Sequence, residues 1–174
     1  MKAVVMAGGE GTRLRPMTAS QPKPMLPVVN RPIMEHVLRL LRQHGFDETV
    51  VTVQFLASLV RNYFGDGEDF GMSLQYATEE APLGTAGSVK NAEDALRDQP
   101  FLVISGDALT DIDLSELVRF HKDNGALVTV GLAAANERRL AAHDASLHQL
   151  RALVSPRPGT GTCWPRRPAS PPSP

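Results

Sequence analysis

The sequence has a single cysteine, few aromatic residues and almost no net charge. Among 174 residues the only thiol is Cys163, and aromatic side chains make up 5%. One thiol excludes an intramolecular disulfide framework, which favours a reducing, cytoplasmic location. A net charge of −1 excludes the broad positive field that binds nucleic acid or anionic membranes. We therefore expect neither nucleic acid nor a membrane as a partner.

Long apolar stretches are also missing. No segment approaches the roughly 20 consecutive apolar residues of a membrane-spanning helix. Met1-Lys2 leads directly into a short apolar run, which predicts a strand rather than a signal peptide. What the sequence does contain is an ordinary hydrophobic content of 42%, in a chain long enough to bury one core.

Short apolar runs alternate with amphipathic stretches over most of the chain. The runs that predict strands are 3–7, 49–53, 73–77, 101–104 and 127–130. The stretches that predict helices are 32–44, 56–64, 84–96 and a segment opened by the capping box Asp113–Glu116. This alternation is typical of an α/β fold with a mostly parallel, helix-covered sheet.

The character of the sequence changes after Leu132. Four apolar residues beyond it have the spacing of one amphipathic helix within 133–154: Leu140, Leu147, Leu150 and Val154. Residues 155–174 are rich in proline and glycine, which predicts a disordered tail. One hypothesis for the change is a disrupted reading frame, which translation of the other two frames would test.

A glycine-rich loop follows the first expected strand. It reads Gly8-Gly9-Glu10-Gly11-Thr12-Arg13. Glycines leave the backbone bare, so that its N–H groups can approach an anion closely. Arg13, Arg15 and Lys23 place cations around this backbone. A buried strand, a bare loop and cations in this order predict a phosphate-binding site.

Two familiar phosphate loops are excluded. The Walker A string Gly-x-x-x-x-Gly-Lys-Ser/Thr does not occur. The dinucleotide fingerprint needs a third glycine where Leu14 stands, and Pro16 interrupts the helix that should follow.

The string that remains, Gly-Gly-x-Gly-Thr-Arg-Leu-x-Pro with a trailing Pro-Lys-Pro at 22–24, resembles the sugar-1-phosphate nucleotidyltransferases. With 21–27 and 30–33 included, it is most similar to the mannose-1-phosphate guanylyltransferase branch. The resemblance covers residues 1–132 and implies a Rossmann-like three-layer sandwich, incomplete at its C-terminal side. It also implies in-line attack of a sugar 1-phosphate on the α-phosphate of a nucleoside triphosphate, with release of pyrophosphate. In this branch the substrates are GTP and mannose 1-phosphate.

The resemblance also assigns roles to single residues. It implies that Arg13 and Lys23 are catalytic, which agrees with the ability of an arginine to bridge phosphate oxygens and of a lysine to act as a point charge. It implies a nucleotide-binding set made of Ala7, Gly8, Gly9, Gly11, Thr12, Arg13, Glu79 and Gly84.

Asp107 is the expected magnesium ligand. With Gly106 it follows the strand at 101–104, and Mg²⁺ commonly takes only one or two protein carboxylates, with water and phosphate completing its shell. The resemblance gives Asp107 the same role and implies Mg²⁺ as the cofactor. Asp113 is better explained as a helix cap, and Asp111 as a turn residue.

Glu79 is the expected reader of the base. Guanine presents two adjacent donors that a carboxylate can accept, whereas uracil and thymine present one donor between two acceptors. Neighbouring residues of a strand face opposite ways, so Glu79 and Glu80 cannot both serve. We favour Glu79, with Gly84 permitting close backbone approach.

Several alternatives stay open. A full family member continues beyond the matched part with a second metal-binding aspartate, a Glu-Lys-Pro segment and a sugar pocket, none of which appears here. The chain could therefore be a catalytically inactive nucleotide-binding fragment or regulatory module. Thymidylyl or uridylyl transfer to glucose 1-phosphate is the substrate-level rival, and a homo-oligomer is compatible with the sequence. The five histidines show no metal-ligand spacing, and we expect them on helix surfaces.

Overall fold

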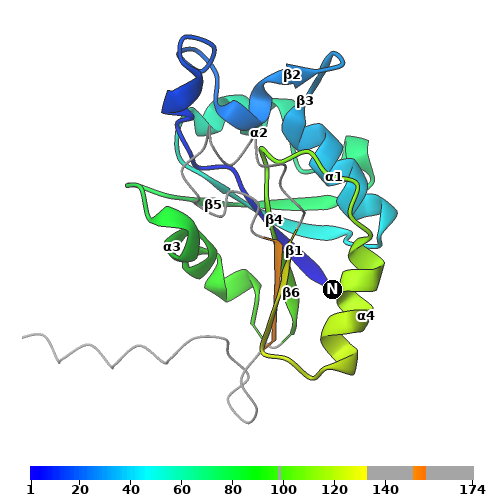
Figure 1. Cartoon of the computed structure of the whole chain (residues 1–174). Helices are drawn as coiled ribbons and strands as arrows, with labels where there is room; N and C mark the ends of the chain where they lie inside the picture. Colours follow the sequence, from blue (N-terminus) through cyan, green and yellow to red (C-terminus); the bar gives the residue numbers. More distant parts are fainter. Residues whose placement is uncertain (98, 133–150, 156–174) are drawn as a thin grey trace, which may run out of the picture.

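The computed structural model describes residues 1–97, 99–132 and 151–155 (Figure 1). In this part of the chain, one sheet has the strand order β5-β4-β1-β6-β8-β7. The strand bounds are β1 Lys2–Met6, β4 Glu48–Val53, β5 Ser73–Thr78, β6 Phe101–Ser105, β7 Val128–Gly131 and β8 Arg151–Val154. β1 pairs in parallel with β4 and with β6, and β4 pairs in parallel with β5. The predicted α/β, Rossmann-like fold with a mostly parallel sheet is confirmed.

The central strand β1 is buried on both faces. Val4 pairs with Val50 on one side and with Val103 on the other. Because side chains alternate along a strand, Val4 and Val5 enter two separate hydrophobic clusters. This is why the segment reads as a continuous apolar run rather than as an alternating one.

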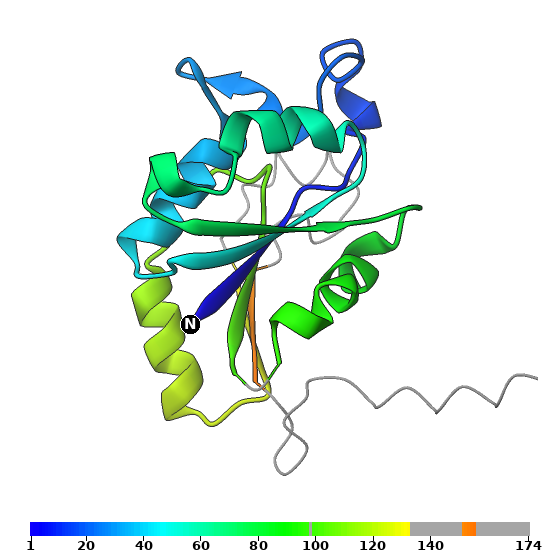
Figure 2. The same cartoon turned by 180° about the vertical axis from the view of Figure 1, so that it is seen from behind.

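Helices cover both faces of the sheet, giving three layers (Figures 1 and 2). The larger cluster joins the sheet to α1 (Ile33–Gln43), α2 (Ala57–Phe64) and α4 (Leu114–Asp123). The smaller cluster joins the opposite face to α3 (Gly84–Asn91) and the 3₁₀ turn η4 (Glu93–Ala95). The single helix expected over 84–96 is therefore two, separated at Ala92. None of the helices in the described ranges is long and apolar enough to cross a membrane.

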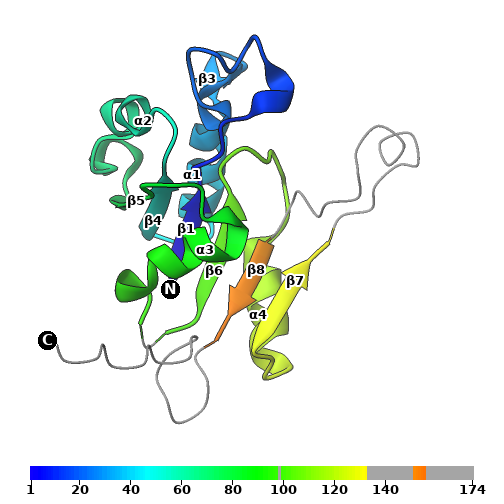
Figure 3. The same ribbon diagram turned by 90° about the vertical axis from the view of Figure 1, so that its left-hand side faces the viewer.

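The helix expected within 133–154 is wrong where the structure describes it. Arg151–Val154 forms β8, which pairs antiparallel with β6 and with β7 (Figure 3). Leu153 is fully buried between Leu102 and Thr129 of the two neighbouring strands. The spacing of the leucines suggested a helix. The segment forms a strand instead, because it can pair with the edges of both β6 and β7. Residues 133–150 and 156–174, with the remaining helix and tail predictions, lie outside the described residues.

The expectation that histidines lie on helix surfaces is wrong for His121 of α4. Its side chain is buried, with Nδ1 2.8 Å from Oγ1 of Thr129 and Nε2 2.7 Å from Oγ of Ser155. Burial lowers the pKa of His121. At the other end of α4, the predicted cap is confirmed, because Oδ1 of Asp113 accepts a hydrogen bond from the Glu116 N–H at 2.9 Å.

Candidate nucleotide-binding site

The glycine-rich loop leaves the carboxyl end of β1. The Ala7 N–H still donates to the carbonyl of Thr52 on β4, at 2.9 Å, and then the chain turns away from the sheet. Gly11 has φ of 63° and precedes η1 (Thr12–Leu14). A Cβ at Gly11 would lie 3.0 Å from side-chain atoms of Thr18 and Lys23, so this position requires glycine for space as well as for conformation. The Thr18 hydroxyl donates to the Gly11 carbonyl at 2.8 Å and fixes the loop.

Thr12 and Arg13 lie in η1, and both side chains are exposed. Arg13 lies two residues after Gly11, the last glycine of the loop. Gly84, which begins α3, has φ of 68° and no heavy atom within 4 Å of an added Cβ. Its positive φ confirms a backbone need for glycine at this point.

Glu79 directly follows β5, which is separated from β1 by β4, and its side chain reaches the glycine loop. Its side chain is buried, Oε2 accepts a hydrogen bond from the Leu83 N–H at 3.4 Å, and Oε1 has no hydrogen-bond partner among the described residues. A Cβ built on Gly8 would lie 3.1 Å from Oε1. Glu80, by contrast, is exposed. The structure thus places one carboxylate oxygen, which is buried and has no partner in the described part of the chain, beside the bare backbone of the loop.

Lys23 and Asp107 form an ion pair across the same edge of the sheet. Nζ of Lys23 lies 2.6 Å from Oδ2 of Asp107, and the Ser105 hydroxyl hydrogen-bonds the other carboxylate oxygen, Oδ1. The Gly106 N–H donates to the Met6 carbonyl at 2.9 Å, which holds the end of β6 against the end of β1. Lys23 lies in η2 (Lys23–Met25), between two buried prolines.

These residues fit a magnesium ion that is held together with a phosphate group. Among the described residues, no three His, Cys, Asp or Glu side chains are grouped closely enough to bind a metal by themselves. Mg²⁺ does not require such a cage, because one or two carboxylates, water and phosphate oxygens complete its shell. Asp107, at a strand end and beside the loop, is the carboxylate that could contribute.

Sequence reasoning missed a second polar network, which supports the segment after Lys23. This segment continues as a hairpin of β2 (Pro27–Val28) and β3 (Arg31–Pro32). The Ile33 N–H donates to the Leu26 carbonyl at 3.0 Å, and Nε2 of His36 lies 3.0 Å from the Val28 carbonyl. The hairpin is thereby fastened to α1.

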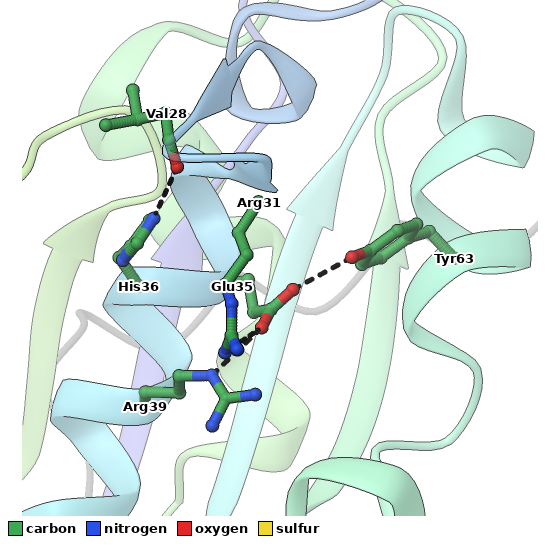
Figure 4. Close-up of polar contacts among 6 residues, drawn as sticks. All are labelled: Val28, Arg31, Glu35, His36, Arg39 and Tyr63. Carbon is green, nitrogen blue, oxygen red and sulfur yellow. Dashed lines mark hydrogen bonds and ion pairs between the residues drawn. The ribbon is translucent and has the colours of Figure 1, made fainter.

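Glu35 of α1 is the centre of this network (Figure 4). Its buried carboxylate pairs with Arg31 at 3.1 Å and Arg39 at 2.9 Å, and accepts a hydrogen bond from the Tyr63 hydroxyl at 2.8 Å. Burial alone would raise the pKa of Glu35, but the hydrogen bonds from Tyr63 and Arg39, with the charges of both arginines, outweigh it and lower this pKa. The same contact raises the pKa of Tyr63. The four-residue spacing of Arg31, Glu35 and Arg39 is the feature of the sequence from which these two ion pairs could have been predicted.

A glycine loop follows the end of a parallel strand, and a lysine and two carboxylates that follow other strands of the same sheet lie around it. This is the edge of the sheet at which α/β proteins commonly bind nucleotides. The chain belongs to the sugar-1-phosphate nucleotidyltransferases, since the model of the nucleotidyl transferase family matches residues 2–140. The expected family is therefore confirmed.

Curated relatives of two specificities match this chain. The UTP–glucose-1-phosphate uridylyltransferase of Synechocystis is 43% identical over 141 residues, which cover 75% of this chain and 36% of that protein. The mannose-1-phosphate guanylyltransferase of Mycobacterium tuberculosis is 40% identical over 137 residues, which cover 79% of this chain and 38% of that protein. The chain thus spans well under half the length of both.

The fold is shared with solved structures of low sequence identity. HddC from Yersinia pseudotuberculosis, complexed with GMP-PN, superimposes with a TM-score of 0.70 at 21% identity, over 88% of this chain and 73% of that one. This likeness establishes the architecture of the described sheet and helices.

Proposed function

We propose that the chain supplies the nucleotide-binding part of a guanylyltransferase, which transfers GMP from GTP to a sugar 1-phosphate and releases pyrophosphate. The observation that carries the proposal is the buried Glu79 carboxylate, whose Oε1 lies beside Gly8 without a partner among the described residues. A buried acceptor of this kind is costly unless a ligand donates to it. Guanine offers N1–H and N2–H₂ side by side, which matches a carboxylate.

Uracil and thymine would fit this carboxylate poorly. Each presents a single N–H between two carbonyl oxygens, so at least one carbonyl would approach the negative charge of Glu79. The Glu79 carboxylate therefore favours GTP over UTP and dTTP, although a uridylyltransferase is among the relatives. Mannose 1-phosphate is the proposed acceptor, on the basis of the guanylyltransferase relatives.

In the proposed reaction, the loop backbone and Arg13 hold the phosphates. The Lys23 ammonium neutralises the charge that develops on the α-phosphate during in-line attack, which is the form of catalysis that phosphoryl-type transfers require. Mg²⁺, held by Asp107 and the phosphates, would supply further charge neutralisation when bound. Gly8, which has no Cβ, leaves Oε1 of Glu79 in place beside the loop backbone.

The test is nucleotide competition with the purified chain. We expect GTP to displace a fluorescent guanine nucleotide more effectively than UTP or dTTP, and Glu79→Gln to reduce that preference, because an amide can donate to a pyrimidine carbonyl. Glu80→Gln is the matched control, since Glu80 is exposed. A preference for UTP in the unmodified chain would favour the uridylyltransferase alternative instead.

Turnover tests the rest of the proposal. Release of pyrophosphate from GTP and mannose 1-phosphate separates an enzyme from a nucleotide-binding module. Because this chain spans 38% of the guanylyltransferase relative, we expect weak, Mg²⁺-assisted GTP binding with negligible GDP-mannose synthesis. Rapid GDP-mannose formation would contradict that expectation and would identify the 174 residues as a sufficient catalyst.

A further inference from the structure

The carboxylate of Asp107 is engaged at both of its oxygens. Ser105, two residues earlier at the end of β6, hydrogen-bonds Oδ1, and Lys23 pairs with Oδ2 at 2.6 Å. The Ser105 contact is local and leaves the charge in place. The Lys23 contact places a cation on Oδ2, and its positive charge repels a metal ion that would bind the same carboxylate.

Lys23 is also well placed to leave Asp107. Its backbone lies between the buried Pro22 and Pro24, and its Cβ lies 3.0 Å from the position of a Cβ on Gly11 of the loop. The side chain thus starts at the glycine loop and extends to Asp107. Rotation about its own four side-chain bonds, without movement of η2, would turn the ammonium towards a phosphate held by that loop.

The ion pair is open to exchange with solutes. The side chains of Lys23 and Asp107 are 35% and 25% exposed, so water and dissolved ions can reach both groups and compete with the contact. A triphosphate carries more negative charge than one carboxylate, and therefore competes well for the ammonium.

Resting on the proposed function, we propose that Lys23 is the counter-ion of Asp107 until a nucleotide and its divalent metal arrive together. The phosphates attract Lys23 away, and the freed carboxylate receives the metal. Ser105 acts as a positioning residue that keeps the carboxylate oriented during the exchange. Metal without nucleotide must therefore compete with Lys23, so the site resists occupation by a metal that brings no substrate.

The experiment measures Mn²⁺ binding without any nucleotide, from the electron paramagnetic resonance signal of free Mn²⁺. We expect weak binding to the unmodified chain and about tenfold tighter binding to Lys23→Met, because a cation close to the metal has been removed. Adding Asp107→Asn to Lys23→Met should abolish the gain. Lys90→Met is the matched control, since Lys90 also pairs with a carboxylate, that of Glu93, at 2.6 Å, and this variant should bind Mn²⁺ as the unmodified chain does.

Circular dichroism verifies that each variant is folded, and Lys23→Gln, which keeps a polar side chain, provides a second measurement if Lys23→Met does not fold. Equal Mn²⁺ affinity in the unmodified chain and the Lys23 variants would overturn the proposal, as would a gain that survives Asp107→Asn. Because these titrations contain no nucleotide, they can fail while the preference for GTP stands. A lost preference for GTP would instead count against the proposed function.

Discussion

Gly8 and Glu79 are in such close contact that a single methyl group at Gly8 would lie 3.1 Å from the carboxylate oxygen Oε1. We expect Gly8→Ala to displace this carboxylate by a few tenths of an ångström and to lower GTP affinity about tenfold, equivalent to about 1.4 kcal/mol. The preference for GTP over UTP should fall as well, because the effect passes through Glu79. Competition binding with both nucleotides measures the two quantities.

Gly9→Ala is the matched control for this prediction, because a Cβ there meets no heavy atom within 4 Å. If Gly9→Ala affects nucleotide binding, it should weaken GTP and UTP alike. An unchanged GTP preference in Gly8→Ala would show that Glu79 does not read the base.

Arg13 should act on the phosphates rather than on the base. We expect Arg13→Ala to weaken GTP and UTP binding by similar amounts, about 1–3 kcal/mol, the usual range for losing a charge-assisted contact. GMP, which lacks two phosphates, should lose less. Calorimetric titration of the three nucleotides provides the comparison.

Arg15→Ala is the control for Arg13→Ala, since Arg15 is also exposed and pairs with Glu10 at 3.4 Å. Equal losses in the two variants would indicate a diffuse positive field instead of a specific contact at Arg13.

Removing the Glu35 carboxylate should loosen the hairpin that follows Lys23. We expect Glu35→Gln to lower the free energy of unfolding by about 1–3 kcal/mol, because Arg31 and Arg39 would lose their charged acceptor. The folded pKa of Glu35 lies below its ordinary value of 4.5. Its contribution is therefore complete above that value and disappears as the pH falls through the lowered pKa.

Urea unfolding between pH 3 and pH 7 measures this contribution. The stability difference between the unmodified chain and Glu35→Gln should shrink at the acid end of the series. A difference that stays constant with pH would mean that the pKa of Glu35 is the same in the folded and the unfolded chain.

His121 should make the fold sensitive to mildly acidic pH. Burial lowers the pKa of His121 in the folded chain below its ordinary value of 6.5, so the unfolded chain binds the proton more readily. The free energy of unfolding should therefore fall as the pH drops through about 6.5, by at most about 1.4 kcal/mol per pH unit. Thermal unfolding from pH 5 to pH 8 follows the change.

His121→Gln should flatten this part of the pH profile, whereas His36→Gln should retain it. A profile that is the same with and without His121 would contradict the assignment.

The parts of the fold that depend on neighbouring residues were predictable from sequence. The apolar run around Val4 and Val5 predicted a strand buried on both faces, and the Asp113 cap was readable from the residue three positions later. Within the site, the alternation of a strand indicated that only one of Glu79 and Glu80 could serve, and the burial of Glu79 agrees with the choice of that residue.

Contacts between residues far apart in sequence were not predictable in the same way. On α4, the position of His121 gave no sign of its partners Thr129 and Ser155, which β7 and the end of β8 supply. Likewise, the pairing of Lys23 with Asp107 depends on η2 and β6 meeting at one edge of the sheet. Of the partners of Glu35, the two arginines were predictable because they are four residues away in the sequence. Tyr63 was not, because it belongs to another helix.

The position of β8 between β6 and β7 has a consequence for the order of synthesis. β7 emerges from the ribosome before β8, yet in the described sheet it contacts β6 only through β8. During translation, the backbone groups on the outer edge of β6 therefore have no hydrogen-bond partners until residues 151–154 are synthesised. Until then β7 also has no partner strand. In a nascent chain stalled after Leu132, β6 would lack a partner on its outer edge and β7 would lack any partner strand, which is the state in which β proteins associate wrongly with one another.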